Sequence, residues 1–463
     1  MVTAHTTAEL GLTALDDEIT VDELPIEGEI PSWLSGNLLR TGPATWDVGS
    51  TALRHWFDGL AMLHSFTVAD GTVSYANKYL DSQTYRSATK AGKLAYGQFA
   101  TDPCRSIFQR IQSVFSGAST DNANVNIAQL GERFVALTES SIPVEFDQRT
   151  LDTAGVPYRA PGQITTAHPH YESGAMLNYA AKLGPRSSYR FYRVDESGIE
   201  VLSSIPVRHP SYMHSFGMTE NWFVLVEFPL VVEPSAMVLS GKPFIENYRW
   251  EPERGTRVTL VDRRSGEVGA RYSLEPFFAF HHVNAYEDGS DVVVDLCAYP
   301  DARIIQDLYL DRIHEAMRDD ARHLQRSYLK RLRLTENGAS SEQIGDATIE
   351  LPRINGRRAR QPHRYVWGTG TRHGWIDEIV RLDTADGSSR TWHEPGQYPG
   401  EPVFVSNPEA TREDDGVLLS VALDTRGGHS TLLILDAETL RPLARAAVPH
   451  HIPHHFHGQF SRT

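Results

Sequence analysis

Residues 416–440 read GVLLSVALDTRGGHSTLLILDAETL, in which two apolar runs flank the polar stretch DTRGGHS. Val, Leu and Ile dominate both runs, and β-branched residues favour strands. Asp and Gly between the runs are typical of a tight turn. We therefore expect two antiparallel strands joined by a hairpin.

The same pattern of short apolar segments and turn residues recurs along most of the chain. Segments of this kind are GTVSYANKYL at 71–80, RFVALTES at 133–140, YRFYRVDESG at 189–198, NWFVLVEF at 221–228, TRVTLVDRRSGEV at 256–268, SDVVVDLCAY at 290–299 and EIVRLDTADGSS at 378–389. Their recurrence over the whole length favours a propeller or a large sandwich of β-sheets. No Pro- or Gly-rich linker separates two cores, so we expect residues 1–463 to form a single domain.

Two segments have a helical pattern instead. Asp102 and Pro103 are suited to the N-cap and the first position of a helix. Helical spacing then puts five apolar residues on one face: Ile107, Phe108, Ile111, Val114 and Phe115. The second segment, 304–334, is rich in Leu, Arg, Asp and Glu, and we expect it to be helical as well.

The composition is that of a folded protein with an acidic surface. Lys and Arg total 44 and Asp and Glu total 59, so the formal net charge is −15, which disfavours nucleic acid as a partner. The two cysteines, Cys104 and Cys297, cannot supply a disulfide framework. The N-terminus lacks the basic and apolar regions of a signal peptide, and no apolar run is long enough to span a bilayer. We therefore expect a cytoplasmic protein.

Histidine is frequent, with 20 copies. Four of them stand in strand-like contexts: His168 in TTAHPH, His214 in SYMHSFG, His281 in FAFHHVNAYED and His457 in HHFHGQF. A propeller can bring such distant positions together, because the inner strand of each blade starts at the axis. Imidazole binds iron, zinc, copper and nickel, so these histidines are candidate metal ligands.

The residues alone leave the choice of ligands open. HPH contains His170 beside His168, and the HH pair contains His282 beside His281. A single buried histidine is more often a hydrogen-bonded core residue than a ligand. The tract HHIPHH at 450–455 is one more candidate metal-binding sequence.

Several motifs, taken together and in order, resemble those of the carotenoid cleavage oxygenases. They are IPSWLSGNLLRTGP at 30–43, HWFDGLAMLHSF at 55–66, the four histidine motifs and FHG at 456–458. Within that family, FATDPCRSIFQRI at 99–111 and TDNANVN at 120–126 resemble the branch of the β-carotene oxygenases and the retinoid isomerohydrolase. Thr101 stands where that branch usually has Pro. The resemblance covers nearly the whole chain and implies an all-β fold, a seven-bladed β-propeller with a few helices and loops capping an axial iron site.

The resemblance also implies which residues form the site. The four iron ligands would be His168, His214, His281 and His457. Three glutamates would each accept the Nδ1–H of one ligand: Glu139 for His214, Glu350 for His281 and Glu401 for His457. Such a carboxylate fixes the tautomer of the imidazole and raises its basicity. His168 would have no carboxylate partner.

Further positions align with the substrate cleft of the family. They are Thr138, which we group with the catalytic glutamates, and the aromatic residues Tyr96, Tyr212, Phe280 and Phe456. An aromatic tunnel suits a polyene, which offers no polar group except at its ends. Without the resemblance, each aromatic residue would be interpreted equally well as part of the core.

The resemblance implies a carotenoid cleavage dioxygenase with one Fe²⁺ per chain and O₂ as co-substrate. The reaction would cleave a C=C bond of a carotenoid or apocarotenoid, and both oxygen atoms would end in two carbonyl products. The chemistry then belongs to the metal and O₂, so no protein base is needed.

Three alternatives remain open. A retinyl-ester isomerohydrolase would use the same iron as a Lewis acid and would consume no O₂. A stilbene-cleaving dioxygenase typically has Lys before the first of the three glutamates, where this chain has Thr138. A non-enzymatic carotenoid-binding propeller would have no use for the complete set of four histidines and three glutamates.

The apolar face predicted after Pro103 suggests contact with a membrane. Arg105 and Arg110 lie near this face, as is typical of a helix that lies flat in the lipid interface. The alternative is an amphipathic helix packed on the propeller. Because the net charge of −15 opposes binding to anionic lipid, we expect at most weak peripheral association at the membrane surface.

Overall fold

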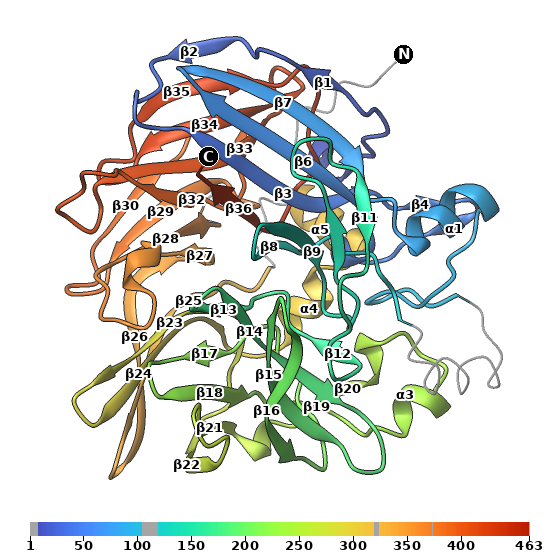
Figure 1. The fold of residues 1–463 in the computed structure, drawn as a ribbon, viewed down its shortest axis with the longest axis vertical. Helices are drawn as coiled ribbons and strands as arrows, with labels where there is room; N and C mark the ends of the chain where they lie inside the picture. Colours follow the sequence, from blue (N-terminus) through green and yellow to red (C-terminus); the bar gives the residue numbers. More distant parts are fainter. Residues whose placement is uncertain (1–7, 104–118, 319–323, 373, 463) are drawn as a thin grey trace.

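The computed structural model describes residues 8–103, 119–318, 324–372 and 374–462. Seven antiparallel sheets surround a common centre, as Figure 1 shows. The predicted all-β, seven-bladed propeller is confirmed. The sheets are called blades 1 to 7 below, in the order in which the chain reaches their main strands.

The first three blades take their strands from the first half of the chain, except for one strand of blade 1 that comes from the C-terminal end. Blade 1 holds β1 (Thr20–Val21), β3 (Gly36–Thr45), β6 (Leu60–Ala69), β7 (Thr72–Tyr79) and β36 (Gly458–Ser461). Blade 2 holds β8 (Asn126–Leu130), β9 (Arg133–Leu137), β10 (Val144–Phe146) and β11 (Thr153–Gly155). Blade 3 holds β12 (Ile164–Thr165), β13 (His170–Glu172), β14 (Ala175–Lys182), β15 (Ser188–Asp195) and β16 (Gly198–Pro206).

The remaining four blades follow in chain order. Blade 4 holds β17 (Gly217–Met218), β18 (Trp222–Glu227), β21 (Thr256–Asp262) and β22 (Val268–Leu274). Blade 5 holds β23 (Phe278–Asp288), β24 (Asp291–Tyr299), β25 (Tyr328–Thr335) and β26 (Gly338–Thr348). Blade 6 holds β27 (Glu350–Arg353), β28 (Tyr365–Gly370), β29 (Glu378–Asp383) and β30 (Ser389–Trp392). Blade 7 holds β2 (Ile26–Gly28), β31 (Gln397–Pro399), β32 (Val403–Ser406), β33 (Gly416–Asp424), β34 (His429–Asp436) and β35 (Pro442–Ala447).

Short elements lie between the blades or in the loops. Two small strand pairs are β4 (Asp47–Val48) with β5 (Thr51–Ala52), and β19 (Leu230–Val232) with β20 (Tyr248–Trp250). The described helices are α1 (Gln83–Ala91), α3 (Ala236–Leu239), α4 (Arg303–Asp307) and α5 (Leu310–Arg318). The 3₁₀ turns are η1 (Ala8–Leu12), η2 (Trp56–Asp58), η3 (Ile245–Asn247), η4 (Pro252–Arg254) and η5 (Gly356–Arg358). None of the helices in the described ranges is long and apolar enough to span a membrane.

Both ends of the chain close the ring. The last strand, β36, pairs antiparallel with β3, so that Gly458 lies opposite Arg40. The early strand β2 pairs antiparallel with β35 and forms the outer edge of blade 7. The first and last blades are therefore each completed by a strand from the opposite end of the chain, and the ring has no open seam.

Apolar side chains between neighbouring blades form the core. Trp367 of β28 in blade 6 is fully buried and stacks on Phe404 of β32 in blade 7, with ring centroids 4.5 Å apart. Its indole N–H donates to the backbone oxygen of Ala437, at 2.9 Å. Contacts of this kind fix each blade against the next and hold the inner strands at defined positions around the axis.

The hairpin expected within 416–440 is present as β33 and β34, paired from Val417–Asp436 to Asp424–His429. Asp424 Oδ1 accepts the backbone N–H groups of Arg426 and Gly427 and so stabilises the turn.

The helix expected at 304–334 is only partly correct. Helices α4 and α5 occupy its first half, but β25 begins at Tyr328. In YLKRLRLT, basic residues and leucine alternate from Arg331 to Leu334 with the period of a strand, and this alternation outweighs the helical propensity of the composition. The helix expected after Pro103, with its apolar face, lies outside the described residues.

Candidate metal centre

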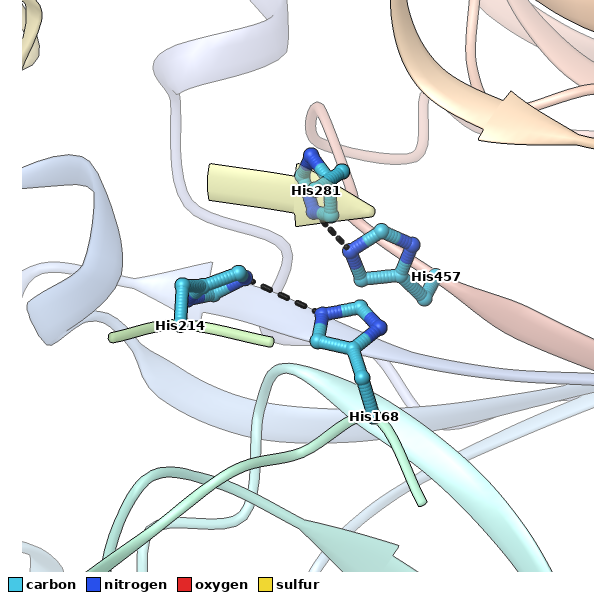
Figure 2. A group of neighbouring side chains, drawn as sticks. All are labelled: His168, His214, His281 and His457. Carbon is cyan, nitrogen blue, oxygen red and sulfur yellow. Dashed lines mark hydrogen bonds between the residues drawn. The ribbon is translucent and has the colours of Figure 1, made fainter. Parts of the chain in front are cut away.

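Four histidines from four different blades converge at the axis (Figure 2). His168 lies between β12 and β13, and His214 lies three residues before β17. His281 lies within β23, and His457 directly precedes β36. Each histidine therefore sits on or beside the inner strand of its blade, where the blades approach one another.

A β-bulge explains why His281 rather than His282 points to the centre. The pairing of β23 with β24 slips between Ala279 and His282, so that the two residues Phe280 and His281 lie opposite one residue of β24, Cys297. Bulges turn a side chain away from its regular direction. His282 instead shares a hydrogen bond of 2.8 Å between its Nδ1 and Ser215 Oγ.

The Nε2 atoms are spaced as ligands of one metal ion would be. His168 and His214 lie 3.0 Å apart at Nε2, as do His281 and His457, and all four atoms lie within 4.8 Å of one another. Two imidazole nitrogens that bind one ion at about 2.1 Å in adjacent positions lie about 3.0 Å apart. The distances therefore fit a single metal ion.

Three of the four histidines are hydrogen-bonded to a carboxylate through Nδ1. The distances are 2.7 Å from His214 to Glu139, 2.5 Å from His281 to Glu350 and 2.7 Å from His457 to Glu401. These are the pairs that the resemblance implies. In the described part of the chain no carboxylate pairs with His168.

The tautomers give a second test of whether a metal fits. An ionised carboxylate only accepts hydrogen bonds, so Nδ1 of His281 and His457 must carry the proton. When both rings carry only that proton, their Nε2 atoms face each other at 3.0 Å with lone pairs, an arrangement that a cation between them would stabilise. The donor set therefore fits a metal ion.

Burial keeps the imidazoles in the form that binds metal. Burial, and secondarily the neighbouring histidines, hold the pKa of His168 well below its usual value. For His457, burial lowers the pKa to about 4, although Glu401 acts in the opposite direction. Both rings are therefore neutral at pH 7, as metal ligands must be.

Two of the carboxylates, Glu139 and Glu350, are themselves held by further hydrogen bonds. The Tyr212 hydroxyl lies 2.8 and 3.0 Å from the two oxygens of Glu139. The backbone N–H of Leu351 donates to Glu350 at 2.7 Å. Burial alone would raise the pKa of Glu350, but His281 and this N–H reverse the effect and lower it.

A cavity of about 210 Å³ lies beside the histidines. His214, His281 and His457 line it, together with Thr138, Phe280 and Phe456 from the residues expected in the substrate cleft. Tyr96 and Tyr212 are not among its lining residues. Tyr212 lies behind Glu139 instead, where its hydroxyl serves the carboxylate.

Sequence reasoning missed Trp56 and Phe57, which also line the cavity. The Phe57 ring stacks near His214, with centroids 6.4 Å apart, and meets Phe456 edge-on at 5.1 Å. Both residues belong to HWFDG at 55–59, which the sequence marked only as part of the resemblance. The signal was present, because a short turn rich in aromatic residues rarely serves as a solvent loop.

Polar groups hold this aromatic turn in place. His55 Nδ1 accepts the N–H of Phe57 at 3.1 Å, and its Nε2 lies 3.0 Å from the backbone oxygen of Ile305. Asp58 is fully buried and accepts the Thr101 hydroxyl at 2.6 Å and the Ala100 N–H at 2.9 Å. The cavity wall therefore rests on a buried polar frame.

Comparison with known proteins agrees with this site. The family model described as Retinal pigment epithelial membrane protein, RPE65, matches residues 12–462. The chain belongs to the carotenoid oxygenase family. The predicted resemblance is thereby confirmed.

Two curated relatives and one solved structure illustrate the family. The mitochondrial carotenoid-cleaving dioxygenase of Macaca fascicularis is 34% identical, over 95% of this chain and 93% of the relative. The carotenoid isomerooxygenase of Galleria mellonella is 35% identical, over 97% of this chain and 95% of the relative. The crystal structure of cobalt-substituted Synechocystis ACO, at 25% identity, covers 100% of this chain and 99% of that one with a TM-score of 0.86. The expectation that the chain is an enzyme of this family is confirmed, since its relatives are named oxygenases.

The first prediction concerns the HH pair. His281→Ala should abolish stoichiometric metal binding, because it removes one of four nitrogens and leaves Glu350 without its partner. His282→Ala should retain one metal per chain, because its Nδ1 is bonded to Ser215. Elemental analysis of both purified variants measures the outcome, and a metal-free His282→Ala beside a metal-loaded His281→Ala would reverse the assignment.

The second prediction concerns the carboxylates. Glu139→Gln, Glu350→Gln and Glu401→Gln keep the shape of the side chain but weaken it as an acceptor. Loss of such a partner typically costs about 10–100-fold in metal affinity or activity. Competition with a chelator measures the affinity of each variant, and wild-type affinity in all three would mean that the carboxylates are only structural.

Proposed function

We propose that the protein binds one Fe²⁺ per chain and uses O₂ to cleave a C=C bond of a carotenoid or apocarotenoid into two carbonyl products. One observation carries the proposal: four imidazoles converge, with Nε2 atoms 3.0 Å apart within two pairs and all within 4.8 Å, and three of them line a largely apolar cavity. A ferrous ion held by these four histidines would supply the activation of O₂.

The protein residues are proposed to hold the metal, orient the imidazole rings and exclude water. His168, His214, His281 and His457 are proposed to hold the metal, with Glu139, Glu350 and Glu401 fixing three of the rings by hydrogen bonds. Phe280 and Phe456 offer an apolar wall that holds a polyene by shape and keeps water from the reacting bond. Thr138 lies in the same wall, next to Glu139.

The alternatives differ in what they consume and bind. An isomerohydrolase would convert a retinyl ester without O₂ uptake, and the name of the Galleria mellonella relative joins isomerisation to oxygenation. A stilbene-cleaving enzyme is disfavoured, because Thr138 offers no cation to a phenolate. A carotenoid carrier is disfavoured, because three carboxylates hydrogen-bonded to three of four converging histidines serve no purpose in storage.

The third prediction tests this function directly. Iron-loaded protein, incubated with a panel of carotenoids, apocarotenals, stilbenes and retinyl esters under ¹⁸O₂, should release two carbonyl products from a polyene, each carrying one ¹⁸O. Mass spectrometry of freshly quenched products measures this, with His281→Ala as the control. Conversion of a retinyl ester without label, or no conversion of any polyene, would reject the proposal.

We also propose weak peripheral contact with a membrane, since a polyene partitions into lipid. Ile107, Phe108, Ile111, Val114 and Phe115 support this contact through their spacing in the sequence alone. Burial of a large apolar side chain contributes about 1.5–3 kcal/mol, so even two inserted residues would give measurable, reversible binding.

The fourth prediction follows from that contact. Wild-type protein should co-sediment with neutral liposomes, and less with anionic ones because of the net charge of −15. The double variant Phe108→Asp/Phe115→Asp should remain in the supernatant. Equal sedimentation of two folded, metal-loaded proteins would reject the contact, and failure of the variant to fold would favour a helix packed on the propeller.

A further inference from the structure

One of the three carboxylates at the metal centre differs from the others in having a cation. Arg353 of β27 holds Glu401 with two hydrogen bonds, from Nε at 2.8 Å and from Nη2 at 2.9 Å. Glu401 is 1% exposed. The fork of Arg353 therefore binds both oxygens of a buried carboxylate.

The same guanidinium reaches the last strand of the chain. Arg353 Nη2 also donates to the backbone oxygen of Gly458, at 2.5 Å. Glu401 completes the contact, because its Oε2 accepts the N–H of Gly458 at 3.0 Å while its Oε1 accepts His457 Nδ1. Arg353 and Glu401 together thus hold both backbone polar groups of Gly458 and the ring of His457.

The backbone of β27 is shaped to allow this contact. In its pairing with β28, Glu350 lies opposite Thr369 and Arg353 lies opposite Trp367, so three steps along β27 match two along β28. Without this bulge the two side chains would point to opposite faces; with it both point to one face. Leu351 within the bulge has a φ of +48°, a conformation that a branched residue adopts only at a cost.

The bulge therefore serves two metal ligands from one short strand. Glu350 holds His281, and Arg353 acts through Glu401 on His457. Gly458 is also the first residue of β36, the strand that closes the ring against β3. A Cβ at Gly458 would lie 2.7 Å from Arg40 Cγ and 2.8 Å from the backbone oxygen of Leu39, so the strand fits here only as glycine.

We propose that Arg353 is a positioning residue that couples closure of the propeller to metal binding. It clamps Gly458 and Glu401, and so places His457 where the other three histidines can share a metal ion with it. By reciprocity, the metal stabilises the docking of β36, and docking of β36 strengthens the binding of the metal. The inference rests on the metal site of the proposed function but on no substrate.

The chain offers a matched control for this clamp. Arg331 of β25 holds Asp295 of β24 with the same fork, at 2.8 Å for both bonds, and Asp295 is fully buried. This pair lies within blade 5 and touches neither a histidine of the centre nor β36. Arg331→Met should therefore destabilise the fold in the way that any broken buried ion pair does, with no specific effect on the metal.

The fifth prediction compares Arg353→Met, Arg353→Lys and Arg331→Met in the full chain, with Co²⁺ as the probe. Chelator competition measures the affinity of the metal-stripped protein for Co²⁺, and thermal unfolding measures stability. Arg353→Met should weaken Co²⁺ binding about 10–100-fold, and Arg353→Lys, which keeps the charge but not the fork, should lie in between. Arg331→Met should lower the Tm yet bind Co²⁺ within about twofold of the wild type.

Amide hydrogen exchange of residues 456–461 distinguishes a positioning role of Arg353 from a merely structural one. Co²⁺ should slow exchange there in the wild type and in Arg331→Met, and by much less in Arg353→Met. Wild-type affinity in Arg353→Met, or an equal loss in Arg331→Met, would overturn the inference. If Arg353→Met fails to fold, Arg353→Lys decides by the same criteria, whereas absence of Co²⁺ binding in the wild type would instead reject the metal site itself.

Discussion

The pairing of β36 with β3 is the constraint on which the metal centre depends. The four histidines lie between positions 168 and 457, and the last of them directly precedes the closing strand. Until β36 lies against β3, His457 has no fixed position and only three imidazoles can meet at the axis. The entropic cost of closing so long a chain grows only slowly with its length, and β2 against β35 shares the task from the other end. The strand pairing that closes the ring therefore also completes the ligand set.

Charge balance explains why the centre can be buried. Glu139, Glu350 and Glu401 bring three negative charges, and Arg353 and Arg40 bring two positive ones, which leaves an excess of one negative charge. A divalent cation changes that to an excess of one positive charge. Burial lowers the pKa of Arg40 to about 10, so its guanidinium is still protonated at pH 7. A divalent ion therefore reverses the sign of the net charge of these groups without changing its magnitude.

The sequence predicted the histidine and glutamate pairs better than the local backbone structure around them. Alternation and turn residues are local signals, so the hairpin at 416–440 could be read directly. The histidine and glutamate pairs join residues as far apart as 75 positions, and only the ordered motifs of the resemblance revealed them. Neither the bulge that selects His281 over His282 nor the bulge in β27 has a residue pattern of its own. At 328–335, the strand period of leucine and arginine was present, but composition obscured it.

Tyr212 and Thr101 show why positions aligned by family can still differ in their role. The resemblance aligns Tyr212 with the substrate cleft. In the structure, however, its hydroxyl donates to Glu139 and its ring is buried behind that carboxylate. Thr101 does what proline cannot: its hydroxyl donates to Asp58 at 2.6 Å and accepts the N–H of Arg54 at 3.0 Å. Burial raises the pKa of Asp58, and these donors only partly offset it. The loop that carries Phe99 is thereby tied to the turn that carries Phe57. Apolar contacts have no fixed direction, so the shape of the cavity depends on directed hydrogen bonds, both in its wall, as between Thr120 and Gln98, and one layer behind it, as at Asp58.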